Sequence, residues 1–166
     1  MRSRLPVGRS GRVVLDTNVL VAAGFNTRSH AARIVEAVRT HRLKMAWSVG
    51  TKRESEHVIR RIPPLHWRDF EELFDEASRV CDAIDVSSYA YILDPADRVF
   101  AALAHATGAS LITGDDHLLA HRSRADVPVL TTHEFVRFAW GDDSDTQARE
   151  SRQTTKDPQR IDEEAA

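Results

Sequence analysis

The sequence has little cysteine and no long apolar run, and both absences limit what the protein can be. Its 166 residues include one cysteine, Cys81, so no disulfide can form within the chain. A single cysteine fits a reducing compartment, and we therefore expect a cytoplasmic protein in which Cys81 is a small buried apolar residue. No apolar stretch approaches the roughly 20 residues that cross a bilayer, so no membrane association is expected. Arginines precede Val13 without an apolar segment, so a secretory signal is not expected either.

Net charge is also small, but it is unevenly distributed. The formal charge is −2 at pH 7. Residues 1–140 carry 19 Lys and Arg against 17 Asp and Glu, whereas residues 141–166 carry 4 against 8. The first part is therefore mildly basic, which permits binding to nucleic acid but does not demonstrate it.

Length and composition predict one domain with a segment on either side. A chain of 166 residues can bury a proper hydrophobic core. We expect a flexible basic N-terminus at residues 1–11, a folded domain at residues 12–140 and a disordered acidic tail at residues 141–166. The tail assignment follows from its polar composition and from the lack of any hydrophobic periodicity there.

Within the folded domain, predicted strands alternate with predicted helices. The apolar run at residues 13–15 predicts a strand buried on both faces. Apolar spacing and capping residues predict the other elements, with nothing assigned to residues 17–28. Further strands are expected at residues 43–47, 83–86, 109–113 and 128–130, and helices at residues 29–41, 48–61, 66–80, 94–107, 117–121 and 132–140. This alternation predicts an α/β fold with three layers, α/β/α, around a central parallel sheet.

Two of the predicted strands end in acids. Asp16 follows the first strand, and Gly114 and Asp115 follow the strand at residues 109–113. In open α/β sheets, ligands bind beyond the carboxyl ends of the strands. If the two strands are neighbours, their acids converge, and convergent carboxylates that repel one another usually bind a divalent cation. The alternative is that Asp16 caps the following segment, because Asp-Thr-Asn is also a turn sequence.

One helical acid is predicted to face the sheet. At 100° per residue, Asp97 lies at the centre of the apolar face that Phe100, Ala101 and Ala104 form. A structural alternative is that Asp94 and Asp97 serve the start of their helix, with Asp94 as the cap and Asp97 stabilised by the helix dipole. Both interpretations stay open from the sequence.

The helix at residues 48–61 offers a second acid. Glu54 shares a face with Val58, whereas Glu56 points to solvent. Glu54 is therefore the candidate, although glutamates also occur at the edge of the buried stripe of ordinary amphipathic helices.

With these four acids placed, the chain resembles a PIN domain, a nuclease module common in bacterial toxin-antitoxin toxins and in RNA-processing proteins. The resemblance covers about residues 12–139. It departs from the family pattern at His117, where an acid is common, and at Thr51, where an apolar residue is usual. The motifs that carry it are Asp-Thr-Asn at residues 16–18, Ser48 with Glu54, Val58 and Ile59, Asp-Pro-Ala-Asp at residues 94–97, Leu-Ile-Thr-Gly-Asp at residues 111–115 and Thr-His-Glu-Phe at residues 132–135.

The resemblance implies a metal-dependent ribonuclease that hydrolyses RNA phosphodiester bonds with a water activated by Mg²⁺ or Mn²⁺. It also implies that the chain is a candidate toxin of a toxin-antitoxin pair, with RNA as substrate, and it leaves room for an antitoxin partner and for a homodimer. The residues expected to hold the metal are Asp16, Glu54, Asp97 and Asp115. Those expected to orient these ligands or water are Thr17, Asn18, Thr113 and Asp116.

Other functions fit parts of the pattern. A non-catalytic PIN-fold module would bind RNA or protein without cleavage. A haloacid-dehalogenase-like phosphatase would use the strand-end Asp as nucleophile, but its general acid would fall at Asn18. A phosphoacceptor receiver domain would leave the two helical acids without a role. A zinc site at His117 and His121 lacks a nearby third ligand.

Overall fold

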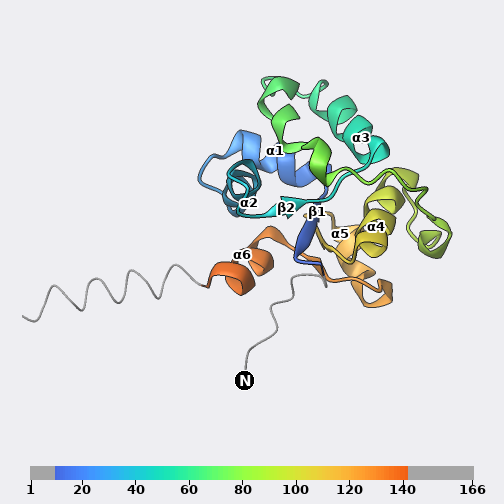
Figure 1. The fold of residues 1–166 in the computed structure, drawn as a ribbon. Coiled ribbons are helices and arrows are strands. Elements are labelled where there is room, and N and C mark those ends of the chain that lie inside the picture. The colour runs from blue at the N-terminus through green and yellow to red at the C-terminus, as the bar shows by residue number, and fades with distance from the viewer. Residues whose placement is uncertain (1–9, 142–166) are drawn as a thin grey trace, which may run out of the picture.

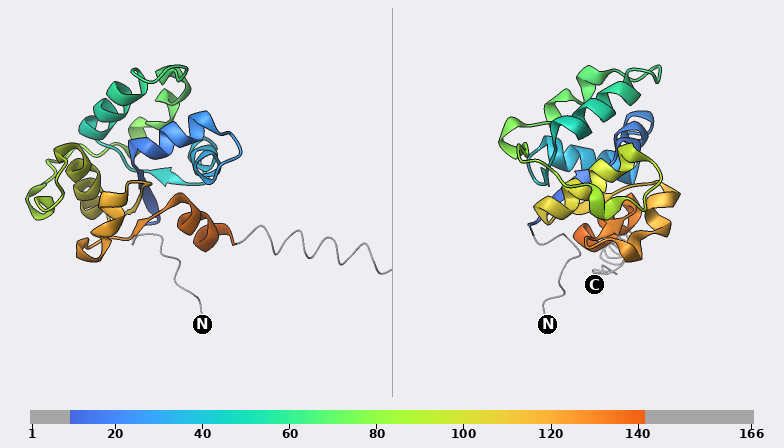
Figure 2. Two further views of the ribbon diagram at one scale, coloured as in Figure 1. Left: turned by 180° about the vertical axis from the view of Figure 1, so that it is seen from behind. Right: turned by 90° about the vertical axis from the view of Figure 1, so that its right-hand side faces the viewer.

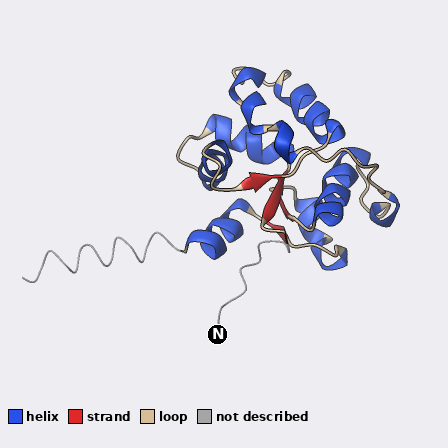
Figure 3. Ribbon diagram, in the orientation of Figure 1, coloured by secondary structure: helices blue, strands red, loops and turns tan. Residues whose placement is uncertain are grey.

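A computed structural model of the protein describes residues 10–141, which form a parallel sheet surrounded by helices (Figure 1). Figure 3 shows the short strands at the centre of the domain, with helices on both sides. The predicted α/β/α fold is confirmed. The segments predicted to be a flexible N-terminus and an acidic tail lie almost entirely outside the described residues. In the order β2-β1-β3-β4, the strands are Lys44–Met45, Arg12–Leu15, Ser110–Ile112 and Val129–Leu130.

Helices cover both faces of this sheet. The helices predicted at residues 29–41, 48–61, 94–107, 117–121 and 132–140 are confirmed to within two residues at each end. Among residues 10–141, no helix is long and apolar enough to span a bilayer. The helices are α1 Thr17–Phe25, α2 His30–Arg39, α3 Val49–Ile59, α4 Pro95–Thr107, α5 Asp116–Ala120 and α6 Thr132–Trp140.

Alternation along the strands divides the core in two. Val13 and Leu15 of β1 face the layer that contains α1, α2 and α6, whereas Val14 packs with α4 and α5 on the opposite face (Figure 2). Successive side chains of a strand point to opposite faces, so β1, β3 and β4 each contribute to both clusters. All three residues are buried, as predicted for a strand covered on both faces.

Local capping explains where the helices begin. The Ser29 side chain accepts a hydrogen bond from the backbone N–H of Ala32 at the start of α2. Ser48 starts α3 in the same way, accepting from Thr51. Helix α4 ends at Gly108, whose φ of 63° lies in the left-handed region that glycine adopts without strain.

The long helix predicted at residues 66–80 is wrong. Three short 3-10 turns occupy this segment: η1 Trp67–Asp69, η2 Glu71–Leu73 and η3 Glu76–Ser78. The predicted apolar residues Trp67, Phe70 and Leu73 are nevertheless buried. Their spacing of three matches the three residues per turn of a 3-10 helix as well as one face of an α-helix. Apolar spacing alone therefore did not distinguish the two structures.

Three further expectations need correction. Helix α1 occupies residues to which no element was assigned, because its almost wholly apolar sequence carries no helical periodicity. Residues 83–86 form no strand. The only strand-like contact near them joins Trp47 to Arg79, where the backbone N–H of Val80 donates to Trp47. Cys81 is exposed rather than buried, because it lies in this surface segment.

Candidate active site

The two strands that end in acids are neighbours. Strand β1 pairs with β3 in parallel, with Leu15 opposite Ile112. The backbone N–H of Asp16 extends this pairing by donating to the carbonyl oxygen of Ile112 at 3.0 Å. Asp16 and Thr113 therefore leave the same edge of the sheet, with Asp115 two residues further on.

Hydrogen bonds join these strand ends into one network. Asp16 is 5% exposed, and its Oδ2 accepts from Thr113 Oγ1 at 2.7 Å and from Asn18 Nδ2 at 3.2 Å. Thr113 Oγ1 in turn accepts from the backbone N–H of Asp115 at 3.0 Å. Asn18 Oδ1 accepts from the backbone N–H of Gly114, also at 3.0 Å. The structure thus places Asn18 and Thr113 where they hold the Asp16 carboxylate.

Burial and charge both act on Asp16. Burial raises the pKa of Asp16, and the carboxylates of Asp115 and Glu54 raise it further by repulsion. The hydrogen bonds from Thr113 and from the backbone of Thr17 oppose these effects. Asp16 therefore lies within electrostatic reach of two of the other candidate acids.

Asp97 is the most crowded of the four. It is half-buried at the start of α4, and burial raises its pKa to about 7. Repulsion from Asp16, Asp94, Asp115 and Glu54 contributes in that order. All four candidate acids from distant parts of the sequence therefore influence one another at this edge of the sheet.

The capping interpretation of Asp97 can be compared with a true capping acid. Asp94 is the N-cap of α4 and accepts from the backbone N–H of Ala96 at 2.9 Å. Glu134 occupies the same helical position in α6 as Asp97 in α4. There it accepts from the backbone N–H of Thr131, and this bond lowers its pKa. The pKa of Asp97 moves in the opposite direction, so repulsion and burial outweigh the helix dipole at Asp97.

Glu54 reaches the site from α3, where it is half-buried at the edge of the packed face. The buried residues of this face are Thr51, Ser55 and Ile59. Ser55 Oγ lies 3.0 Å from Thr17 Oγ1, and this buried hydrogen bond fixes α3 against α1. Thr51 is polar at a position where the family pattern has an apolar residue. Its hydroxyl has a structural role there, because it completes the capping box of α3.

Asp115 has a second role in the fold. As N-cap of α5 it accepts through Oδ1 from the backbone N–H groups of His117 at 2.7 Å and Leu118 at 3.3 Å. Of the other two predicted orienting residues, Thr17 reaches the Asp16 carboxylate through its backbone N–H and not through its side chain. The Thr17 hydroxyl bonds to α3, and Asp116 is exposed and is not among the charges that shift the pKa of Asp16 or Asp97.

The donor chemistry of the four acids fits a hard divalent cation. All four offer carboxylate oxygens, and a cation would relieve the repulsion that raises the pKa of Asp97. Among residues 10–141, however, no three His, Cys, Asp or Glu side chains stand in positions that already form a metal cage. In the described structure the site is therefore a group of mutually repelling carboxylates that do not yet share one ion position.

Three residues near the acids were not selected from the sequence. A pocket of about 290 Å³ beside Asp97 and Asp115 is also lined by Leu93 and by His117 and His121. The spacing of the two histidines by four residues was the only sequence signal, and it was considered for zinc alone. Leu93 carried no signal, because an apolar residue just before a helix ordinarily packs into the core.

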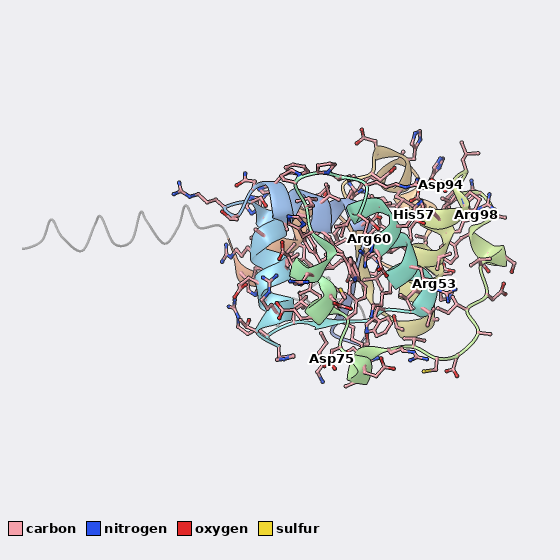
Figure 4. All side chains as sticks on the ribbon, turned by 90° about the horizontal axis from the view of Figure 1, so that it is seen from above. Arg53, His57, Arg60, Asp75, Asp94 and Arg98 are labelled. Atoms are coloured by element: carbon pink, nitrogen blue, oxygen red, sulfur yellow. The ribbon has the colours of Figure 1, made fainter. Side chains whose placement is uncertain are left out.

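Cationic side chains flank the acids. Figure 4, which looks onto this end of the domain, shows Arg53, His57 and Arg60 along α3, with Asp94 and Arg98 at the start of α4. Arg60 pairs with Glu56, the glutamate predicted to face solvent. Helices α3 and α4 are in contact at this end. An anionic polymer that reaches the acids would therefore meet positive charge on α3.

A central parallel sheet with acids gathered beyond its strand ends defines an α/β/α protein with a carboxylate site. The family model described as PIN domain matches residues 12–117, and the chain belongs to that family. A solved structure of FitAB bound to an IR36 DNA fragment is similar in fold, with 17% sequence identity and a TM-score of 0.47. The match covers 72% of this chain and 94% of that one. No curated protein matches the chain.

Proposed function

We propose that the protein is a metal-dependent ribonuclease that hydrolyses phosphodiester bonds in single-stranded RNA. The observation that carries this proposal is the convergence of the acids at one end of the sheet: Asp16 and Asp115 follow the neighbouring strands β1 and β3, close enough to Asp97 for repulsion to raise its pKa. Such crowding destabilises the fold, and metal binding is the usual reason to retain it. Membership of the PIN domain family supports the same chemistry.

In this proposal Asp16, Asp97, Asp115 and Glu54 hold the metal. When bound, Mg²⁺ or Mn²⁺ supplies a water of lowered pKa and neutralises charge on the phosphate. Thr113 and Asn18 keep the Asp16 carboxylate in one orientation through their hydrogen bonds to Oδ2. Arg53 on α3 provides positive charge for the RNA backbone beside the acids.

An antitoxin partner and a homodimer remain predictions from the family resemblance. The FitAB structure contains a DNA fragment. For this chain, co-expression with a small protein encoded next to it, followed by size-exclusion chromatography with light scattering, would measure both associations.

The test of the proposal is cleavage of a labelled single-stranded RNA with Mg²⁺, with Mn²⁺ and with EDTA. We expect cleavage with either metal and none in EDTA. Asp97→Asn should lower the rate by more than the roughly 10- to 100-fold that loss of an outer hydrogen-bond partner costs a metal site. Asp82→Asn, at an exposed carboxylate in the segment before η4 Ser87–Tyr89, is the matched control and should cleave normally.

Two outcomes would contradict the proposal. Cleavage undiminished by EDTA would exclude the metal mechanism. Binding of RNA without cleavage under all conditions would instead favour the non-catalytic module, with which the unassembled positions of the acids among residues 10–141 are also compatible.

A further inference from the structure

The pocket beside the acids has a mixed lining that the metal chemistry does not require. Ile92 and Leu93 form one part of its wall, and His117 of α5 and His121 just after α5 form another part. Asp94, Asp97 and Asp115 line the remainder. Leu93 is 85% exposed, which is unusual for a large apolar side chain at the mouth of a pocket.

The wall that carries Leu93 is fixed in place. Arg98 of α4 donates through Nε to the carbonyl oxygen of Ile92 and through Nη2 to that of Leu93, the latter at 3.4 Å. Ile92 itself is buried in the core cluster of α4. The Leu93 side chain is therefore exposed, while the hydrogen bonds from Arg98 fix its backbone.

The histidine wall is held as well. Asp115 caps α5, which carries His117 and leads into His121. The His121 ring packs edge-on against Tyr91, with ring centroids 6.1 Å apart. The guanidinium group of Arg124 lies 4.1 Å from the centre of the Tyr91 ring, so that Tyr91 contacts both Arg124 and His121.

The chemistry of the lining selects an occupant. Imidazole rings and an aliphatic side chain suit the faces of a planar ring, and carboxylates accept hydrogen bonds from ring and amino N–H groups. The same three carboxylates repel a phosphate. A volume of about 290 Å³ suits one splayed-out base rather than a base pair.

We infer that this pocket binds one unpaired nucleobase of the RNA, next to the phosphate that the metal of the proposed function would hold beside Asp97 and Asp115. The inference rests on the proposed function, which supplies the RNA. Leu93 and His121 contact the faces of the base, and Asp94 lies at its polar edge. The pocket therefore determines which nucleotide stands beside the cleaved bond, and it excludes duplex RNA because a paired base cannot enter.

Binding can be measured apart from cleavage. The probe is a fluorescein-labelled single-stranded RNA hexanucleotide in EDTA, compared with copies made abasic at each position in turn. In the wild type, the abasic change at one position should weaken binding by at least about fivefold, the lower end of what a stacked base contributes. In the variants Leu93→Ala and His121→Ala, removal of the base at that position should weaken RNA binding less than twofold.

Matched controls separate the pocket from general effects. Val86→Ala removes an exposed apolar side chain elsewhere in the same loop region, and His133→Ala removes an exposed histidine on α6 that also makes one ring contact. In both control variants, removal of the base should weaken RNA binding as much as it does in the wild type. The exposure of Leu93 means that its truncation leaves the core intact.

The outcomes distinguish the pocket from the proposed function. An abasic response that is equal in wild type and pocket variants, or equal at all positions, overturns the pocket, as does a failure to bind the hexanucleotide at all. Cleavage in Mn²⁺ is scored separately. RNA cleaved without any pocket effect overturns the pocket alone, whereas a base-dependent pocket without cleavage overturns the nuclease alone.

Discussion

Replacing Asp97 by Asn removes one negative charge from the most crowded position among the four acids. The folded-state pKa of Asp97 is about 7, against an ordinary value of 3.8. Below pH 3.8 the carboxyl is neutral in both folded and unfolded chains and costs nothing. As the pH rises from 3.8 to about 7, the unfolded chain loses the proton first, so that the folded state loses stability. Above pH 7, Asp97 is ionised in the folded chain as well, and the loss of stability is complete.

The size of this penalty follows from the shift. A difference of about 3 units would correspond to an upper limit of about 4 kcal/mol. Asp97 is only half-buried, and solvent screening reduces the expected penalty to about 1–2 kcal/mol. Without metal, the free energy of unfolding of Asp97→Asn should therefore exceed that of the wild type by about 1–2 kcal/mol at pH 8. The two free energies should become equal near pH 4.

The assay is urea unfolding of both proteins in EDTA between pH 4 and pH 8, repeated at pH 8 with Mg²⁺ or Mn²⁺. The wild type should gain more stability from the metal than the variant, because under the proposed function the variant lacks one of the four ligands. Asp116→Asn is the matched control, since Asp116 also lies in the first turn of a helix that an Asp caps, but is exposed. It should show only the small helix-dipole loss of about 0.3–1 kcal/mol.

A different result would refute this reasoning. If the free energy of unfolding of Asp97→Asn is about 0.3–1 kcal/mol below that of the wild type at every pH above 5, as expected for the Asp116 control, then Asp97 is only a helix-dipole partner. Equal metal-induced stabilisation of the two proteins would remove Asp97 from the metal site.

Two further changes test the support of the site and the path of the RNA. Thr113→Val removes the hydroxyl that donates to Asp16 and accepts from the Asp115 N–H, so the free energy of unfolding should fall by about 1–3 kcal/mol in urea titrations; an unchanged value would mean that water replaces the hydroxyl. Arg53→Glu should weaken RNA binding, measured by fluorescence anisotropy. The slope of the logarithm of the binding constant against the logarithm of the salt concentration should become less steep by about 0.7 for each phosphate that the protein no longer neutralises. Lys44→Glu is its control at the opposite edge of the sheet, and an equal effect there would show that only net charge matters.

Local signals predicted most of the fold. The apolar run of β1, the capping serines of α2 and α3, and Pro95 with Gly108 at the two ends of α4 are all short-range features, and the elements lie where these features placed them. The segment at residues 66–80 and helix α1 were not predicted. In the first, apolar spacing fits two kinds of helix. In the second, the exposed side of the helix is also mainly apolar, as at Ala22 and Phe25, so the periodicity on which the prediction depends is missing.

By itself the sequence determined the identity of the four acids, the elements that carry them and the end of the sheet at which Asp16 and Asp115 emerge. These follow from strand ends and helix faces, which depend on residues a few positions apart. Only the tertiary structure decided that β1 and β3 pair directly, that Thr113 and Asn18 hold Asp16, and that Leu93 and His121 line one pocket with Asp97. Those interactions join residues up to 97 positions apart. They depend on how whole layers pack, and no local pattern of side chains specifies that packing.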